Sequence, residues 1–135
     1  MKTIFILSMF FNIAVSQERT SLSEEQKIDM LLDYIKEQEN VVFIRNGEEH
    51  SAADASDHLG MKRRFGWFHG FSDGTASEFI DKLASESSSS GEKYKIKITV
   101  NGKSRVIFLR DFLFAKLKEL EKSEKKRNTA NAAAN

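Results

Sequence analysis

Residues 43–59 read FIRNGEEHSAADASDHL, and within this stretch a strand, a tight turn and a helix start follow one another. The β-branched and aromatic residues at its beginning predict a strand. Asn46-Gly47 predicts a two-residue turn, because both residue types tolerate positive φ. Ser51 is placed to cap a helix whose first turn contains Asp54. The stretch therefore predicts a short hairpin that runs directly into a helix.

Capping boxes, in which the first and fourth residues bond each other's backbone, predict two further helices. SEEQ at residues 23–26 opens an amphipathic helix over residues 24–39, which Asn40 can end in a left-handed conformation. TASE at residues 75–78 opens another helix. The apolar face of that helix is expected to consist of Phe79, Ile80, Leu83 and Ala84.

A second hairpin and a last helix are predicted towards the C-terminus. Residues 94–100 alternate between apolar and polar side chains, which is typical of a strand with one wet face, and Asn101-Gly102 turns the chain. A two-residue turn would place Ile98 opposite Arg105. We favour a three-residue loop, which places Ile96 opposite Val106 and keeps one face apolar. Asp111 is expected to cap the last helix, with inward-facing leucines at 113, 117 and 120.

Helices and hairpins thus interleave without long parallel strands, which predicts an α+β fold: a small single domain of about four helices with short antiparallel hairpins. We expect a signal peptide over residues 1–16, a linker over 17–22, the domain over 23–122, and a charged, low-complexity, disordered tail over 123–135.

The N-terminus has the pattern of an export signal. Lys2 precedes the mostly apolar run IFILSMFFNIAV, residues 4–15, which is shorter than the ~20 residues of a membrane span. Small residues at Ala14 and Ser16 fit cleavage before Gln17. We therefore expect an exported protein with no transmembrane segment after cleavage.

Charge and cysteine content narrow the class of protein. Removal of residues 1–16 leaves 20 basic and 20 acidic residues, and this neutrality argues against a nucleic-acid binder, which needs cations to neutralise phosphates. The chain contains no cysteine, so packing without disulfides must hold the fold.

Four segments, FIRNGEEH, HLGMK, TASEFIDKLAS and SSSSGEKY, follow the signal in this order. In them the chain resembles the YfeK-like family of small exported bacterial proteins, which carries a domain of unknown function. The resemblance spans roughly residues 23–120 and implies the periplasm of a Gram-negative-type bacterium, or secretion, and no reaction. The chain departs from the family in its longer, more aromatic loop at residues 63–74. The recurrent positions here are Phe43, Arg45, Asn46, Gly47, His50, His58, Lys62, Thr75, Phe79, Ser87, Ser88, Ser90, Gly91 and Tyr94.

His50, Asp54 and His58 are spaced by four residues. On one continuous helix they would share a face and could offer nitrogen, oxygen and nitrogen ligands to zinc. If Ser51 is the N-cap, however, His50 lies outside the helix. The alternative is that His50 anchors the turn while His58 packs with Lys62 and Asp54 on the helix surface. We favour this structural reading and expect no metal and no cofactor.

The serine run before Gly91 allows three interpretations. Ser90 to Lys93 spells S-x-x-K, a motif of serine enzymes, but this serine follows a helix and the companion motifs are absent, so we assign no catalytic residue. Backbone N–H groups of residues 88–91 could instead form an anion-binding nest, aided by Arg45 and Lys62. The third interpretation is an ordinary helix end.

The loop RRFGWFHGFSDG at residues 63–74 joins cations to aromatic side chains. It is expected to close over the core through Phe65 and Phe71. Alternatively, Trp67 and Phe68 are exposed as a contact for a partner, a glycan or the membrane interface.

Together these features favour a small exported binding or envelope-accessory protein without evident catalytic machinery. The alternative is a small cell-wall-directed hydrolase or metal-dependent enzyme that uses His50 and His58. The expected partner is an envelope protein or a cell-wall-derived ligand, not nucleic acid. The candidate ligand-binding residues are Arg45, Asn46, Gly47, His50, His58, Lys62, Ser88, Ser90, Gly91 and Tyr94.

Overall fold

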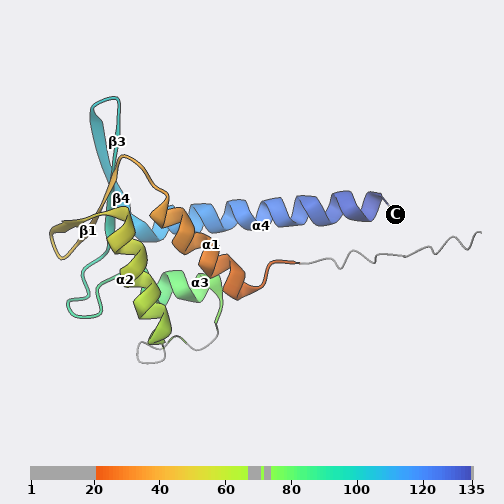
Figure 1. Cartoon of the computed structure of the whole chain (residues 1–135), viewed down its shortest axis with the longest axis horizontal. Coiled ribbons are helices and arrows are strands. Elements are labelled where there is room, and N and C mark those ends of the chain that lie inside the picture. Colours follow the sequence, from red (N-terminus) through yellow and green to blue (C-terminus); the bar gives the residue numbers. More distant parts are fainter. Residues whose placement is uncertain (1–20, 67–70, 72–73, 135) are drawn as a thin grey trace, which may run out of the picture.

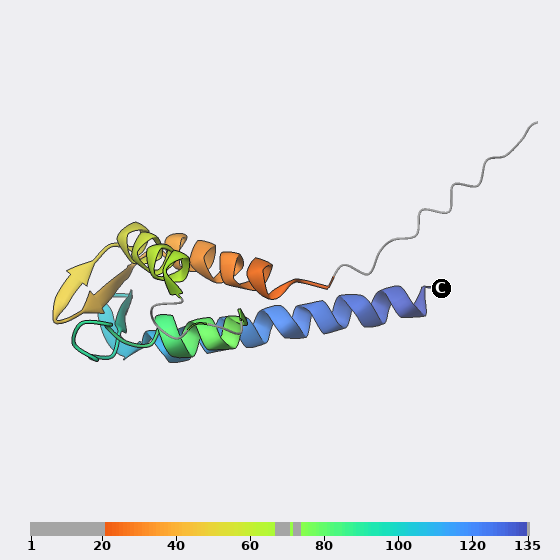
Figure 2. The same cartoon turned by 90° about the horizontal axis from the view of Figure 1, so that it is seen from below.

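Two layers of helices extend from a four-stranded antiparallel sheet at one end of the molecule (Figures 1 and 2). The computed structural model describes residues 21–66, 71 and 74–134; the predicted signal peptide and the side chains of Trp67 and Phe68 lie outside this part. The predicted α+β class, with four helices and antiparallel hairpins, is confirmed. The elements are α1 (Glu24–Lys36), β1 (Val41–Arg45), β2 (Glu48–His50), α2 (Ala52–Arg64), α3 (Ala76–Glu78), the π-helical turn η2 (Phe79–Leu83), β3 (Lys95–Val100), β4 (Lys103–Phe108) and α4 (Leu109–Ala133).

Three of the predicted helix caps are present, at Ser23, Ser51 and Thr75. The Ser23 hydroxyl accepts a hydrogen bond from the Gln26 N–H at 3.1 Å, and the Gln26 side chain accepts one from the Ser23 N–H. Ser51 caps α2 by accepting from the Asp54 N–H at 3.1 Å, so His50 lies outside that helix. Because each cap satisfies an N–H that has no partner inside the helix, it fixes where the helix begins.

The core lies between the two helical layers and the inner face of the sheet. In Figure 2, α1 and α2 form one layer while α3 and α4 form the other. The strands are ordered β2-β1-β3-β4, and Phe43 of β1 pairs with Ile96 of β3 on the buried face. Burial of this apolar surface is the main stabilising contribution to the fold. The fully buried large side chains are Phe79, Ile28, Leu31, Ile35, Leu59, Ile80, Leu83, Ile96 and Leu113.

The favoured register of the second hairpin is wrong. The structure has the two-residue turn, with Ile98 opposite Arg105 and Ile96 opposite Ile107. Asn101 and Gly102 both adopt positive φ, 51° and 75°, and such a turn matches the twist of the flanking strands. In this register Val106 is half-exposed on the outer face, whereas the favoured register placed it on the apolar face opposite Ile96.

The last helix is longer than predicted at both ends. It begins at Leu109 after Phe108, so Asp111 lies in the first turn instead of capping it. The helix continues to Ala133, which contradicts the prediction of a disordered tail from residue 123 (Figure 1). Residues 123–133 include lysine, glutamate and alanine, which favour helix, and contain neither glycine nor proline to end one.

The prediction for the aromatic loop is half correct. Phe71 packs against the core, with its ring centre 6.5 Å from that of Phe79. Phe65 is 52% exposed, because α2 ends at Arg64 and the next residue points away from the core. Among the helices of the described residues, none combines the length and the apolar character needed to cross a bilayer.

Candidate functional site

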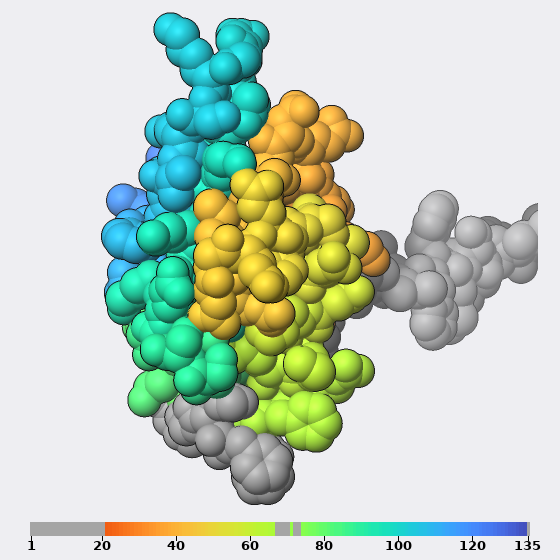
Figure 3. Space-filling model, turned by 90° about the vertical axis from the view of Figure 1, so that its left-hand side faces the viewer, coloured from red at the N-terminus to blue at the C-terminus, as the bar shows by residue number. Residues whose placement is uncertain are grey.

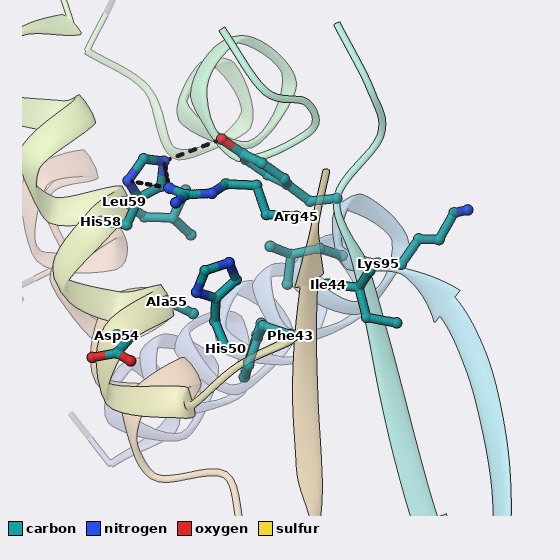
Figure 4. Close-up of a pocket in the computed structure, with 11 residues that line it drawn as sticks. Phe43, Ile44, Arg45, His50, Asp54, Ala55, His58, Leu59 and Lys95 are labelled. Atoms are coloured by element: carbon teal, nitrogen blue, oxygen red, sulfur yellow. Dashed lines mark hydrogen bonds between the residues drawn. The ribbon is translucent and has the colours of Figure 1, made fainter. Parts of the chain in front are cut away.

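A partly open pocket of about 170 Å³ lies between β1 and α2 (Figure 4). Four of the sequence-predicted candidates, Arg45, His50, His58 and Tyr94, line it. They come from β1, β2, α2 and the residue preceding β3, so the fold brings together side chains that are distant in sequence. The pocket is lined by Phe43, Ile44, Arg45, His50, Asp54, Ala55, His58, Leu59, Tyr94, Lys95 and Leu109.

Arg45 is held by His58. One guanidinium nitrogen, Nη1, lies 2.8 Å from Nδ1 and 3.0 Å from Nε2 of the His58 ring. A guanidinium can only donate hydrogen bonds, so His58 must offer an unprotonated nitrogen. Burial, with the charges of Arg45, Lys62 and His50, lowers the pKa of His58 from 6.5 to about 4. His58 is therefore neutral at pH 7 and orients the arginine without cancelling its charge.

Lys62 stands behind this pair and is almost fully buried, with 5% exposure. Its ammonium donates to the Glu86 carbonyl at 3.0 Å and to the Tyr94 hydroxyl at 3.2 Å. Burial lowers the pKa of Lys62 from 10.5 to about 8 against the attraction of Glu86, and Arg45 lowers it further. A buried ammonium held by neutral oxygens costs folding free energy.

Tyr94 connects the two cations through His58. Its hydroxyl lies 3.3 Å from His58 Nε2 and accepts from Lys62, and the two rings meet edge to face with centres 6.3 Å apart. Burial raises the pKa of the Tyr94 hydroxyl, although Arg45 opposes this. Lys62, Tyr94, His58 and Arg45 form one connected row, which we call the cationic row. In the described part of the chain, no carboxylate forms an ion pair with either of its cations.

His50 presents the other polar group of the pocket. Figure 4 shows its ring between β1 and α2, beside Phe43 and Ala55. Its Nε2 is buried without a hydrogen-bond partner among the described residues, and the Glu48 carboxylate is 4.0 Å away, too far for a hydrogen bond. Buried polar atoms normally have a partner, so this nitrogen is available to a ligand or to water.

One wall of the pocket is apolar, and the sequence did not identify it. Phe43, Leu59 and Leu109 are each at most 4% exposed and line the cavity along with Ala55. Phe43 was expected to lie in a strand, and no role was predicted for Leu59. Leu109 was missed because the last helix was expected to begin at Asp111.

The serine turn lies apart from the pocket. Ser88, Ser90 and Gly91 are exposed, and none of them lines the cavity. Ser90 Oγ donates to Oδ1 of the Asn46 side chain, and Nδ2 of the same side chain donates to Ser87 Oγ at 3.2 Å. The Gly91 N–H donates to the Ser87 carbonyl at 2.8 Å, with Gly91 at φ 73°. The turn thus braces the first hairpin, where Asn46 and Gly47 form the tip.

The proposed metal ligands do not form a cluster. His50, Asp54 and His58 all line the pocket, yet no three His, Cys, Asp or Glu side chains of the described residues could hold a metal ion together. Figure 4 shows the Asp54 carboxylate directed away from Arg45 and His50. Ser90, the serine of the S-x-x-K sequence, is not among the pocket residues.

The sequence matches a family model and is similar to a named relative. The sequence model described as "Family of unknown function (DUF5329)" matches residues 22–121, most of the chain. The "Uncharacterized protein YfeK" of Salmonella typhimurium is 38% identical over 71 residues, which is 53% of this chain and 57% of that protein. The match thus spans little more than half of the relative. No solved structure matches.

Proposed function

We propose that this chain, which belongs to the family of unknown function DUF5329, is a small exported binding protein whose pocket receives a small anion. The observation that carries the proposal is the charge of the pocket. Arg45 lines it with no carboxylate partner in the described residues. His50 lines the same pocket, and its buried Nε2 has no hydrogen-bond partner among those residues. A bound anion would supply a negative charge for Arg45 and a hydrogen-bond acceptor for His50.

The cationic row supports this assignment because its two cations form no ion pair with a carboxylate of the described residues, which costs stability. Lys62 is 5% exposed and Arg45 is fixed by a neutral histidine. An arrangement that held the fold alone would pair these cations with Asp or Glu. Costly buried polar groups are typical of functional sites.

The binding test is an NMR titration of the ¹⁵N-labelled protein with acetate and with phosphate. We expect at least one anion to shift amides of β1, β2 and α2 and to saturate. Arg45→Gln should weaken that binding more than tenfold, because a charged hydrogen bond is worth about 1.5–3 kcal/mol. Arg105→Gln, on the exposed face of β4, is the matched control and should bind like the native chain.

Two results would refute the proposal: no saturable shift with either anion, or undiminished binding by a folded Arg45→Gln variant. Thermal melts of both variants show that each remains folded.

Export is the second part of the proposal, and it rests on the apolar run at residues 4–15 and the small residues before Gln17. The test is expression of the full chain with a C-terminal tag in a Gram-negative host. We expect the protein in the periplasmic fraction, with a mass that begins at Gln17. A cytoplasmic protein that retains residues 1–16 would contradict export and leave the pocket proposal standing.

A further inference from the structure

We propose that the pocket selects a carboxylate carried on a small apolar body, in preference to phosphate or a neutral molecule. This inference rests on the proposed anion-binding function and names its ligand class. Four features of the pocket carry it: its volume, its two unlike walls, the placement of its donors and its charge.

The volume limits the ligand to a few heavy atoms. A cavity of about 150 Å³ can hold benzene, so the 170 Å³ here suits a body of roughly six to eight heavy atoms. Drug-sized ligands need ~300 Å³ or more. The pocket therefore fits a short organic acid or the last residue of a peptide.

The two walls require a ligand with two different ends. Phe43, Leu59 and Leu109 form an apolar surface that offers no hydrogen bond from its side chains. Arg45 and His50 adjoin this surface on the same face of the sheet, because Phe43 pairs with His50 and lies two residues before Arg45 on β1. A phosphate has oxygens on every side, and those against the apolar wall would lose water without gaining a donor. A carboxylate has both oxygens at one end and leaves its apolar end for that wall.

The donors match the two oxygens of a carboxylate. Nη1 of Arg45 is engaged by His58, which leaves the rest of its planar fork for a ligand oxygen. His50 Nε2, buried and unpartnered, is available for the second oxygen when it carries a proton. The two residues lie on adjacent strands, β1 and β2, so a bound group can bridge them.

The charge of the pocket favours one negative charge. Arg45 is its one direct cation among the side chains that point inward, because Figure 4 shows the Lys95 ammonium directed away. Lys62 adds a field from behind Tyr94, and its nitrogen is already bound to two oxygens. One guanidinium neutralises a monocarboxylate and leaves a dianion half-compensated.

The experiment compares three probes of similar size by calorimetry and NMR: isobutyrate, isobutyramide and inorganic phosphate. We expect isobutyrate to bind at least about tenfold more tightly than either of the others, given the strength of charge-assisted hydrogen bonds. Phosphate binding without isobutyrate binding would overturn this inference and spare the anion-binding function. Equal binding of isobutyrate and isobutyramide, or no binding of any probe, would overturn both.

A fourth probe separates the two sources of such a group. Nα-acetyl-D-alanyl-D-alanine presents the carboxylate at a peptide end, and isobutyrate presents it on a free acid. Tighter binding of the peptide indicates a peptide terminus as the natural source, and tighter binding of isobutyrate indicates a free acid. Both results support a carboxylate ligand, and failure of both probes contradicts it.

Three variants test the walls. Ala55→Leu fills the apolar side and should abolish isobutyrate binding. His50→Leu should weaken it about tenfold, and His50→Gln, which keeps an N–H donor, should restore most of the affinity. If His50→Gln binds as poorly as His50→Leu while both melt like the native chain, the donor role of His50 is refuted. If folded Ala55→Leu still binds isobutyrate, the ligand lies elsewhere.

Discussion

The Asn46-Gly47 turn and the Asn101-Gly102 turn have almost the same backbone, with φ of 52° and 77° in the first and 51° and 75° in the second. Their surroundings differ. Asn46 bonds the serine turn through Ser87 and Ser90. The second turn stands out from the body, as Figure 3 shows, and Val100 beside it is 61% exposed. A local signal thus sets the shape of both turns, and tertiary contacts make only the first part of a site.

The strands beneath the two turns repeat this difference. β1 carries Phe43 into the core and Arg45 into the pocket. The tip of the second hairpin carries Val100 and Lys103, both exposed. The second hairpin is therefore an internal reference. A comparable substitution in each hairpin distinguishes the stability that comes from the turn itself from the stability that comes from contacts around the first hairpin.

The largest difference is expected for the apolar residue near each turn. Phe43→Ala should lower the free energy of unfolding by about 3–5 kcal/mol, because the side chain is 4% exposed and its removal leaves a cavity. Val100→Ala should change it by less than about 0.5 kcal/mol, as is usual for exposed positions. Urea unfolding at pH 7 measures both. Comparable losses would show that the second hairpin is buried in solution.

The next effect is a gain in stability. Lys62→Met should raise the free energy of unfolding at pH 7 by about 1–3 kcal/mol, because one pKa unit is worth ~1.4 kcal/mol and the variant removes a desolvated charge. Since the pKa of Lys62 falls from 10.5 to about 8 on folding, the unfolded chain binds more protons between these values. Native stability therefore rises with pH through that window, and the gain of the variant shrinks.

The control for Lys62 lies in the second hairpin. Lys103→Met, at an exposed position of β4, should alter stability by less than about 0.5 kcal/mol at any pH in the window. A Lys62→Met variant that is less stable than the native chain at pH 7, and by more than at pH 10, would show that the ammonium stabilises the fold. The cationic row would then need no functional explanation.

Local signals predicted most of the fold. Hydroxyl caps at Ser23, Ser51 and Thr75 depend on neighbours within a few residues, so the sequence reveals them directly. Asn40 is left-handed as predicted, but α1 ends at Lys36 and not at residue 39, so Asn40 does not cap it. The register of the second hairpin was mispredicted because an apolar pattern was weighed above turn geometry. The length of α4 was mispredicted because low complexity was taken for disorder, although these residue types form helices well.

The candidate site was predictable only in part. Arg45, His50 and His58 stood out as polar residues around a turn, and all three line the pocket. The contact between Tyr94 and Lys62 joins residues 32 positions apart and has no local signal. The sequence could not show that apolar residues line the pocket, because a leucine that lines a cavity and one that fills a core have the same sequence pattern.

A smaller effect is expected for the acid stability of the fold, through the protonation of His58. Its pKa falls from 6.5 to about 4, so between these values the unfolded chain binds more protons and the native state loses stability as pH drops. His58→Gln keeps an acceptor for Arg45 and removes this loss, which we estimate at ~1–2 kcal/mol across the window.

The measurement is urea unfolding of both chains from pH 7 to pH 4. The groups facing His58 are Arg45, Lys62, His50 and Tyr94. Of these, His50 is the other histidine. His50→Gln is therefore measured beside His58→Gln. If the stability curves of the native chain and of His58→Gln run parallel, folding does not lower the pKa of His58, and burial does not keep it neutral beside Arg45.

The smallest expected difference, that between two matched glycine variants, tests the two turns directly. Asn46→Ala and Asn101→Ala both force alanine into the left-handed region, at a cost of about 1–2 kcal/mol each. Asn46→Ala also removes the bonds to Ser87 and Ser90, which adds roughly 0.5–1.5 kcal/mol. Glycine accepts positive φ, so Asn46→Gly and Asn101→Gly isolate the lost side-chain bonds from the backbone strain. We expect the first glycine variant to be less stable than the second by about 0.5–1.5 kcal/mol in urea. If the two glycine variants unfold at the same concentration, the serine turn does not brace the first hairpin, and Arg45 is positioned by His58 alone.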